Sequence, residues 1–477
     1  MSAQAYSDVF TWPVVGQALR WKHARTALQL VLLAVAALMV IHGLRGPQLA
    51  PANLSTVVTW VHYRGLLIVA LLAAGNLFCT GCPFILVRDT ARRLHAPTVR
   101  WPRWLRRKWL ALALFVAVLF VYELFDLWAL PRATAWLVLG YFGAALAVDL
   151  LFAGGSFCKY VCPIGQFNFL ASTLSPLELR VREPGTCGTC RTADCIKGRR
   201  APEAPLQVVR RGCELGLFLP SKVGNLDCTL CLDCVRACPH DNIALATRVP
   251  ALELADPRRR SGIGRLAQRW DFAALSVVFV FGALLNALGM IAPVYALERA
   301  IGRVLGTTAE APALAVLFLL LLVGAPALLL GLASWWSAAA TTSSPGRQFR
   351  SFVYALVPFG AGMWGAHYGF HLLTGALTLI PVTQSAMVDL FGRAWLGAPR
   401  WTLVGLQPGA VFPVQLGLLA LGTMGSMAVA YVIAERERPS KPGAAAAPWI
   451  AVTLVLFVAA VWMLVQPMDM RATGVLG

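Results

Sequence analysis

The stretch from Ala74 to Thr90 reads AGNLFCTGCPFILVRDT, and the rest of the chain is best interpreted from it. It places Cys79, Cys82 and a proline directly after an apolar run that is long enough to cross a membrane. A second stretch, GGSFCKYVCPIGQ, repeats this arrangement with Cys158 and Cys162. The two Cys-Pro motifs therefore predict a weak internal repeat in which an apolar hairpin ends in a pair of thiols.

The composition is that of an integral membrane protein. The 477 residues are 58% hydrophobic and only 13% charged. We expect nine transmembrane helices, at 27–44, 56–78, 109–129, 135–155, 271–293, 312–334, 351–375, 411–434 and 447–466. The predicted fold class is an all-α polytopic membrane protein with one polar insert. Its parts are an N-terminal four-helix membrane domain (1–156), the insert (157–270) and a C-terminal five-helix membrane domain (271–477).

The distribution of basic residues predicts the orientation in the membrane. The loop 86–108 is rich in Arg and Lys, whereas the loops expected on the opposite side carry few. The positive-inside rule therefore places the N-terminus and the 157–270 insert in the cytoplasm. The net charge of +19 is explained by orientation and contact with anionic lipid, or by docking of an acidic redox partner. No nucleic-acid-binding module accompanies the charge.

The 12 cysteines all lie between Cys79 and Cys238, in parts of the chain expected in or beside the cytoplasm. Thiols are kept reduced there, so clustered cysteines indicate metal ligands rather than disulfides. The run CTLCLDCVRACP contains Cys228, Cys231, Cys234 and Cys238 followed by proline, which is the spacing of bacterial [4Fe–4S] ferredoxins. Zinc is the alternative, but zinc sites usually pair two separated C-x2-C segments.

An upstream set of cysteines looks like a degenerate first half of a two-cluster ferredoxin. It consists of Cys187, Cys190, Cys195 and Cys213. In two-cluster ferredoxins the fourth cysteine of each run serves the other cluster, so Cys238 would join the first set and Cys213 the second. Two departures keep a structural zinc open for this half. Four residues separate Cys190 from Cys195, and Cys213 is followed by Glu214 instead of proline.

The two Cys-Pro motifs supply the remaining four thiols, Cys79, Cys82, Cys158 and Cys162. If the two hairpins pack together, these thiols complete a third four-thiolate site, and the 12 cysteines divide into three sets with none left over. The alternative is that they are small buried apolar residues. Pro83 and Pro163 are suited to the first turn of short helices at the membrane surface. The insert itself is predicted to be an α+β two-cluster ferredoxin-like segment.

Together these motifs resemble the membrane polyferredoxin family, over about residues 25–250. That family includes the quinol-oxidising membrane subunit of the periplasmic nitrate reductase system and the membrane protein supporting nitrous-oxide reductase. The resemblance implies three [4Fe–4S] clusters and electron transfer in a bacterial inner membrane. The chain departs from the family in its first pair, which is C-x2-C-P where C-x3-C-P is usual. It also has five further spans and no extracytoplasmic flavin-binding domain.

Ionisable residues in the expected spans form a second group of candidates, because such residues are costly in a bilayer. Those that we expect toward the outer half include His42, His62, Glu123, His367 and His371. Three interpretations are open: a quinone pocket, a b-type haem held by imidazoles from facing helices, and a structural hydrogen-bond network. His367 and His371 are four residues apart and share one helix face.

Two main functions follow from the sequence. The first is an electron-transfer protein, an oxidoreductase component, that links a cytoplasmic redox protein or reductase subunit to a membrane quinone or haem. The second is a membrane-anchored relay to a separate partner protein, without a quinone or haem site of its own. A third hypothesis is a cluster-based assembly or sensing protein. No dinucleotide fingerprint, phosphate-binding loop or Ser-His-Asp motif is evident.

Overall fold

The computed structural model describes residues 6–92, 97–201, 203, 208–261, 263–438 and 440–468. Within it the chain forms two compact units. Unit 1 comprises 1–35, 70–111 and 140–269, and unit 2 comprises 36–69, 112–139 and 270–477. All 12 cysteines belong to unit 1, whereas His42, His62, Glu123, His367 and His371 belong to unit 2.

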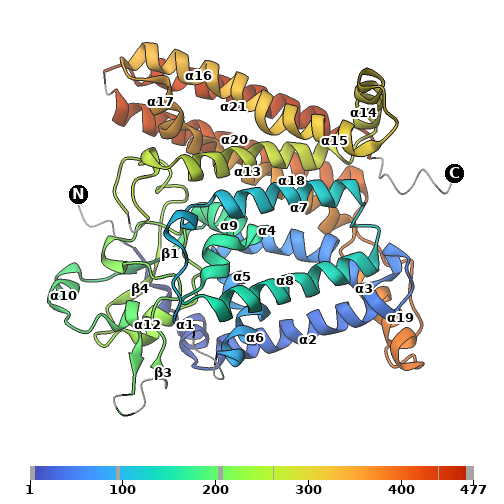
Figure 1. The fold of residues 1–477 in the computed structure, drawn as a ribbon, viewed down its shortest axis with the longest axis horizontal. Coiled ribbons are helices and arrows are strands. Elements are labelled where there is room, and N and C mark those ends of the chain that lie inside the picture. The colour runs from blue at the N-terminus through green and yellow to red at the C-terminus, as the bar shows by residue number, and fades with distance from the viewer. Residues whose placement is uncertain are drawn as a thin grey trace. The chain divides into compact units, whose positions relative to one another are not determined.

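The structure is mostly helical, as Figure 1 shows, and it confirms a multi-pass α-helical membrane protein. Among the described residues, seven helical segments are long and apolar enough to cross a membrane. They are Ala24–Arg45, Leu54–Ala74, Pro131–Leu151, Trp270–Leu288, Glu310–Thr341, Pro408–Glu437 and Pro442–Leu464. The hydrophobic pattern of the sequence therefore located most spans within a few residues, because each span is one continuous apolar run.

Two of the nine expected spans take other forms. The span expected at 109–129 is the helix α7 (Trp109–Leu124), which has only 16 residues. The span expected at 351–375 belongs to the segment Pro345–Thr374, which continues after a bend of 61° into Leu379–Phe391. The bend lies at Gly375, where a Cβ atom would come within 2.6 Å of a side-chain carbon of Val61. A close side-chain approach therefore favours glycine at the bend.

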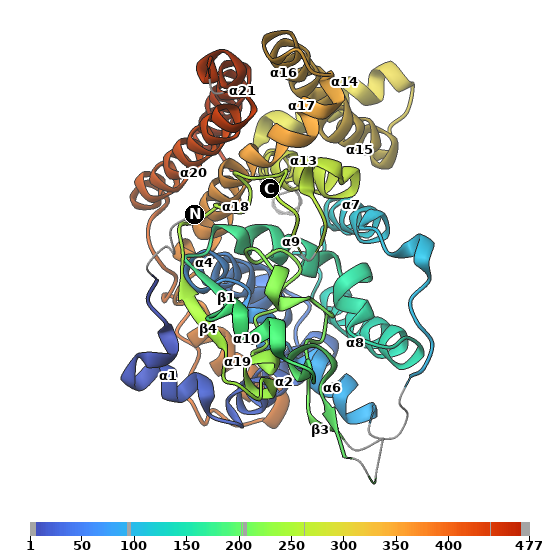
Figure 2. The same ribbon diagram turned by 90° about the vertical axis from the view of Figure 1, so that its left-hand side faces the viewer.

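Unit 1 combines short helices with two small sheets. Its helices are α1 (Pro13–Arg20), α5 (Leu77–Thr80), α6 (Pro83–Ala91), α9 (Pro163–Ala171), α10 (Pro184–Thr189), α11 (Asp194–Lys197) and α12 (Asp233–Ala237). Strand β1 (Leu177–Val181) pairs antiparallel with β4 (Ile243–Thr247), and β2 (Arg199–Arg200) pairs with β3 (Val208–Arg210). Figure 2 shows β1 and β4 side by side. The helices α6 and α9 begin at Pro83 and Pro163, which confirms that both prolines stand in the first turn of short helices.

Four helices contribute residues to both units: α2 (Ala24–Arg45), α4 (Arg64–Ala74), α7 and α8 (Pro131–Leu151). Unit 2 further contains α3 (Leu54–Thr56), α13 (Trp270–Leu288), α14 (Ala292–Leu305), α15 (Glu310–Leu319), α16 (Ala325–Thr341), α17 (Pro345–Phe352), α18 (Val357–Thr374), α19 (Leu379–Phe391), α20 (Pro408–Glu437) and α21 (Pro442–Leu464). Helices α18 and α20 pack closely, since a Cβ on Gly362 would lie 2.7 Å from the Leu418 carbonyl oxygen. Small residues allow such close helix packing in membranes.

Candidate metal centres and a buried histidine pair

The thiols of the two Cys-Pro motifs interact electrostatically within unit 1, and we call this set the hairpin quartet (Cys79, Cys82, Cys158 and Cys162). Cys79 lies on α5, Cys158 lies on the π-helical turn Phe157–Val161, and the other two cysteines cap α6 and α9. Burial raises the pKa of Cys79, and the nearby Cys82 and Cys162 raise it further. Burial likewise raises the pKa of Cys158, as do Asp149, Cys162 and Cys82. The two pairs are therefore close enough to interact electrostatically.

Hydrogen-bond donors point at the sulfur atoms of the hairpin quartet. The Gly165 N–H group donates to Cys162 Sγ over 3.2 Å, and Asn168 Nδ2 donates to Cys79 Sγ over 3.4 Å. Gly165 also leaves room at this site, because a Cβ there would lie 3.5 Å from Cys162 Sγ and 3.2 Å from the Cys158 carbonyl oxygen. Such donors stabilise thiolates, so the set is suited to bind a metal rather than only to pack.

A second set, the inner quartet, consists of Cys213, Cys228, Cys231 and Cys234. Burial raises the pKa of Cys234 well above its usual value, and Cys231, Cys228 and Cys213 raise it further. Burial and the adjacent Asp233 raise the pKa of Cys231 to about 12. Every residue from Gly224 to Cys234 is buried, so the three later thiols lie in the interior of unit 1. Thiols with such raised pKa values bind a cation only with release of their protons.

The loop that carries the inner quartet has an unusual backbone. Asp227, Leu230 and Leu232 have φ angles of 57°, 50° and 61°, in the left-handed region that residues other than glycine seldom adopt. Backbone N–H groups of Leu230 and Asp233 donate toward Cys228 and Cys231. Alternation of right- and left-handed residues turns successive N–H groups inward and makes anion-binding concavities of the kind found at iron–sulfur sites. The strain is therefore consistent with a site that holds a negatively charged group.

The third set, the outer quartet, consists of Cys187, Cys190, Cys195 and Cys238. Burial, together with the nearby Cys238, Cys187 and Cys190, raises the pKa of Cys195 to about 11. Asn242 donates its backbone N–H group to Cys238 Sγ over 3.4 Å and its side-chain amide to Cys187 Sγ over 3.5 Å. Hydrogen bonds from the Ala193 N–H group and the Thr192 hydroxyl lower the pKa of Cys190 to about 7. The outer quartet thus has the same donor chemistry in a more open setting.

The electrostatic interactions among the 12 thiols therefore fall within three groups of four. Cys213 lies with the later run and Cys238 with the earlier run, which is the exchange that a two-cluster ferredoxin would have. Each group offers thiolate sulfur together with N–H donors aimed at sulfur. This donor set fits a thiolate-bound iron–sulfur cluster, and thiolate quartets also bind zinc.

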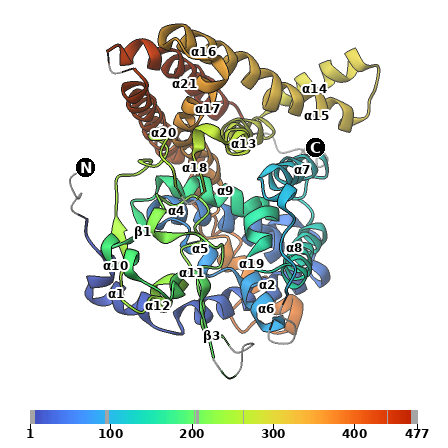
Figure 3. The ribbon, with the colours of Figure 1, turned by 60° about the vertical axis from the view of Figure 1, so that its left-hand side comes forward.

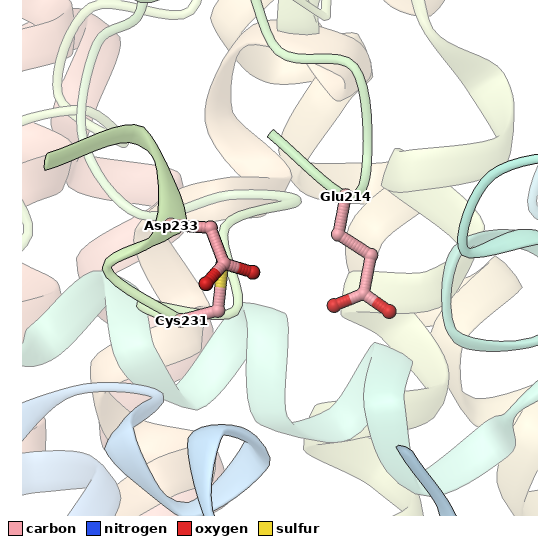
Figure 4. Close-up of side chains that lie close together, drawn as sticks. All are labelled: Glu214, Cys231 and Asp233. Atoms are coloured by element: carbon pink, nitrogen blue, oxygen red, sulfur yellow. The ribbon is translucent and has the colours of Figure 1, made fainter. Parts of the chain in front are cut away.

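Two carboxylates lie against the inner quartet, and the sequence had not marked them as site residues. The ligand atoms of Glu214, Cys231 and Asp233 lie within 4.8 Å of one another. Figure 4 shows the Asp233 and Cys231 side chains close together and Glu214 facing them. The one available signal was Glu214 itself, which stands where a ferredoxin has proline after its fourth cysteine. A carboxylate beside a thiolate adds negative charge, so the site requires compensating cations.

Buried arginines supply that compensation. Arg25 donates to Asp233 over 2.6 Å and lies 3.4 Å from a carboxylate oxygen of Glu214. Arg88 pairs with Glu214, with Asp149 over 3.3 Å and with Asp89 over 2.7 Å. The positive charge of Arg25 acts to lower the pKa of both Cys82 and Cys231. One guanidinium thus lies close to the hairpin quartet and the inner quartet at once.

Direct hydrogen bonds join the loops of these two quartets. The Thr80 hydroxyl donates to the Leu230 carbonyl oxygen over 2.8 Å and lies 3.3 Å from that of Thr229. Asn76 donates to the Cys228 carbonyl oxygen over 3.2 Å. Thr80 lies between Cys79 and Cys82 in the sequence, and Leu230 lies between Cys228 and Cys231. The two quartets are therefore neighbours, linked by one side-chain hydroxyl.

Unit 2 contains a separate group of buried polar residues around α18. His367 and His371 have ring centroids 5.1 Å apart, and their Nε2 atoms are buried without a hydrogen-bond partner among the described residues. Arg64 donates to the Trp60 carbonyl oxygen over 3.0 Å and to the Tyr122 hydroxyl over 3.2 Å. Its guanidinium also lies 4.6 Å from the ring centroid of Tyr368. This cluster of buried hydrogen-bonding groups is capable of binding a polar ligand.

The other three candidates in unit 2 have partners. His42 accepts the Leu54 N–H group at Nδ1 over 3.0 Å, and its Nε2 atom lies 3.1 Å from Asp389. His62 Nε2 lies 3.3 Å from the Thr378 hydroxyl. Glu123 accepts the Asn286 amide over 3.1 Å. The two histidines of α18 therefore differ from His42 and His62, because their Nε2 atoms remain available to a ligand.

Comparison of the chain with protein-family models, with curated proteins and with solved structures gives no match.

Proposed function

We propose that the protein is a membrane-bound iron–sulfur electron-transfer protein whose three thiolate quartets each hold one [4Fe–4S] cluster. The observation that carries this proposal is the sorting of all 12 cysteines into three sets of four, each with N–H donors directed at sulfur. Bound in these sites, the clusters would accept and donate single electrons. A purely structural role for the thiols offers no reason for the strained, N–H-lined loop from Asp227 to Leu232.

The burial and the contacts of these quartets support an order for electron transfer between them. Three of the four cysteines of the outer quartet lie in the segment from Glu183 to Arg200, which has no buried residue, so this quartet is accessible to a cytoplasmic redox protein. Three of the four thiols of the inner quartet are buried, and Thr80 connects its loop to the hairpin quartet. Arg25 and Arg88 place positive charge beside the inner and hairpin quartets and favour additional negative charge there. We propose that the outer, inner and hairpin quartets are successive electron-transfer sites, in that order.

For an electron-transfer site within the membrane we favour a quinone over a b-type haem. A haem of the expected kind would take imidazoles from facing helices. The histidines with unpartnered Nε2 atoms, His367 and His371, both lie on α18, whereas both ring nitrogens of His42 are engaged. A quinone needs donors to its carbonyl oxygens, which Arg64 and the two imidazoles would supply. The alternative is a relay to a partner protein with no quinone or haem site in this chain.

Iron content and spectroscopy test the first part. The anaerobically purified protein should contain about 12 iron atoms, four for each of three clusters. The variants Cys158→Ser and Cys234→Ser should each lose about four iron atoms and one set of paramagnetic resonance signals, while the control Ser221→Ala keeps all three. Zinc in place of iron, or clusters that stay oxidised at physiological potentials, would instead favour a structural, assembly or sensing role.

Quinone chemistry is tested with the reduced protein and a soluble quinone analogue. Replacement of both His367 and His371 by alanine should slow quinone reduction at least about tenfold, with iron content unchanged, because the ring donors are lost. The control His23→Ala lies in unit 1 and should leave the rate unaltered. An unchanged rate in the double variant favours the relay, and a haem absorbance band in the parent protein favours haem.

A further inference from the structure

A basic cleft opens beside the inner quartet in unit 1. Its volume is about 680 Å³, and its wall includes Cys213, Glu214 and Asp233. Cys213 is half-buried, whereas the other three thiols of the inner quartet are buried. The cleft therefore brings solvent, and anything that binds from solvent, next to the most accessible thiol of that quartet.

Apart from Asp89, the remaining charged residues of the cleft wall are basic. Arg92, Lys197, Arg200 and Arg211 line it together with Arg88. Arg88 and Arg211 are paired with Asp89, and Arg92 donates to the carbonyl oxygens of Phe152 and Gly154 over 3.0 and 2.8 Å. The acidic side chains Glu214 and Asp233 are held by Arg25. An incoming ligand therefore meets positive charge before it reaches Cys213.

A two-stranded arm, made of β2 and β3, extends this surface. All residues of both strands are exposed, and β3 lies at the edge of unit 1 in Figure 3. Val208 and Val209 are 51% and 56% exposed and are flanked by Arg199, Arg200 and Arg210 across the two strands. The base of the arm is tight, since a Cβ on Gly198 would lie 2.7 Å from the Arg210 carbonyl oxygen. Exposed apolar residues within a basic rim are typical of a protein-docking surface.

The arm also connects two quartets. It begins four residues after Cys195 of the outer quartet and ends three residues before Cys213 of the inner quartet. At its base the Cys213 N–H group donates to the Cys195 carbonyl oxygen over 2.8 Å. A protein bound to the arm and the cleft would thus lie beside Cys195 of the outer quartet and Cys213 of the inner quartet.

We propose that the cleft and the β2–β3 arm form the docking surface for a small soluble electron-carrier protein with a carboxylate-rich rim around its redox group. This inference rests on the proposed electron-transfer function. Carboxylates of the carrier would enter the basic cleft, and its apolar rim would cover Val208 and Val209. The carrier would lose one electron, and a cluster held by the outer or the inner quartet would gain it, so no proton or further reactant is required.

The test uses the full-length protein in neutral phosphatidylcholine nanodiscs and an acidic plant-type [2Fe–2S] ferredoxin as probe. Binding is measured by biolayer interferometry, and reduction of the protein by stopped-flow absorbance, at low and high salt. Charge reversal in Lys197→Glu with Arg200→Glu should weaken both binding and the bimolecular rate at least about tenfold at low salt. The charge-retaining variant Lys197→Arg with Arg200→Lys should stay within about twofold of the parent protein in both measurements.

A matched control separates docking from general electrostatics. The variant Arg259→Glu with Arg260→Glu makes the same charge change at exposed residues that do not line the cleft. Equal losses in both reversal variants, or no loss in either, would overturn the proposal. So would carrier binding that appears only with anionic phosphatidylglycerol in the nanodiscs, which would assign the basic surface to lipid. Photoreduction by deazaflavin reports separately whether the clusters accept electrons. Clusters that deazaflavin does not reduce would count against the proposed function. The binding measurement would still test whether the carrier docks on this surface.

Discussion

The outer and inner quartets each offer four thiols, but in contrasting surroundings. Around the outer quartet, no residue from Glu183 to Arg200 is buried, whereas every residue from Gly224 to Cys234 around the inner quartet is. Hydrogen bonds lower the pKa of Cys190 to about 7, and burial with Asp233 raises that of Cys231 to about 12. The same chain therefore contains one four-cysteine set in an exposed segment and another in a largely buried one.

The largely buried set requires charge compensation that the exposed one does not. Arg25 and Arg88 bind Asp233, Glu214, Asp149 and Asp89 beside the buried thiols. Lys108 is buried as well, and it donates to Asp227 over 2.6 Å, next to Cys228. In water such charges would be stabilised by solvent, but inside the protein each needs a partner. The following predictions test this contrast, from the largest expected effect to the smallest.

Thiol reactivity should show the contrast most strongly. In protein freed of metal, the thiolate fraction of a group rises as the pH passes its pKa. At pH 8 Cys190, with its pKa of about 7, should be roughly nine-tenths thiolate, and Cys231, with its pKa of about 12, roughly one part in ten thousand. Iodoacetamide labelling followed by peptide mass spectrometry should therefore modify Cys190 at least about a thousandfold faster. Comparable labelling rates of Cys190 and Cys231 in the folded protein would contradict the contrast between the two quartets. Denatured protein, in which both thiols react alike, is the reference.

Loss of Arg88 should lower the stability of the folded protein, because Arg88 belongs to the ion cluster beside the buried thiols. In Arg88→Met the carboxylates of Asp89, Asp149 and Glu214 lose a common buried partner. Removal of one member of a buried ion cluster costs about 3–5 kcal/mol of unfolding free energy. Arg88→Lys keeps the charge but not the forked geometry and should cost less. Unfolding in mixed detergent micelles measures the effect, with exposed Arg191→Met as the control. Equal stability of Arg88→Met and the parent protein would show that the network is not required.

Thr80→Val should have the smallest effect on stability and a specific effect on electron transfer. It removes the hydroxyl that bonds to the Leu230 carbonyl oxygen, at a cost of about 1 kcal/mol. Electron exchange between the hairpin and inner quartets should slow, whereas exchange between the outer and inner quartets stays as it was. Freeze-quench paramagnetic resonance after a short reductant pulse follows both steps. The control Thr189→Val removes a hydroxyl near the outer quartet, and slowing of both steps by Thr80→Val would contradict a local role.

Several features were accessible from the sequence because they depend on local pattern. Apolar runs gave most of the membrane-spanning helices, and the positions of Pro83 and Pro163 gave the starts of α6 and α9. Cysteine spacing predicted three sets of four, and the electrostatic interactions between thiols fall within those sets, while cluster binding stays a prediction. Spacing carries this information because one short loop supplies several neighbouring ligands. The short helix α7 and the bend after Thr374 were missed, since hydropathy alone does not report helix length or local bending.

The sequence by itself determined a multi-pass helical membrane protein with 12 cysteines confined to one part of the chain. Only the tertiary structure decided which charges and hydroxyls surround those thiols: Arg25 and Asp233 are 208 residues apart in the chain, and Thr80 and Leu230 are 150 apart. It also decided that the Nε2 atoms of His367 and His371 stay unpartnered among the described residues while His42 is engaged. The physical reason is that spacing along the chain fixes local geometry. Contacts between distant segments depend on how the helices pack, which no local pattern records.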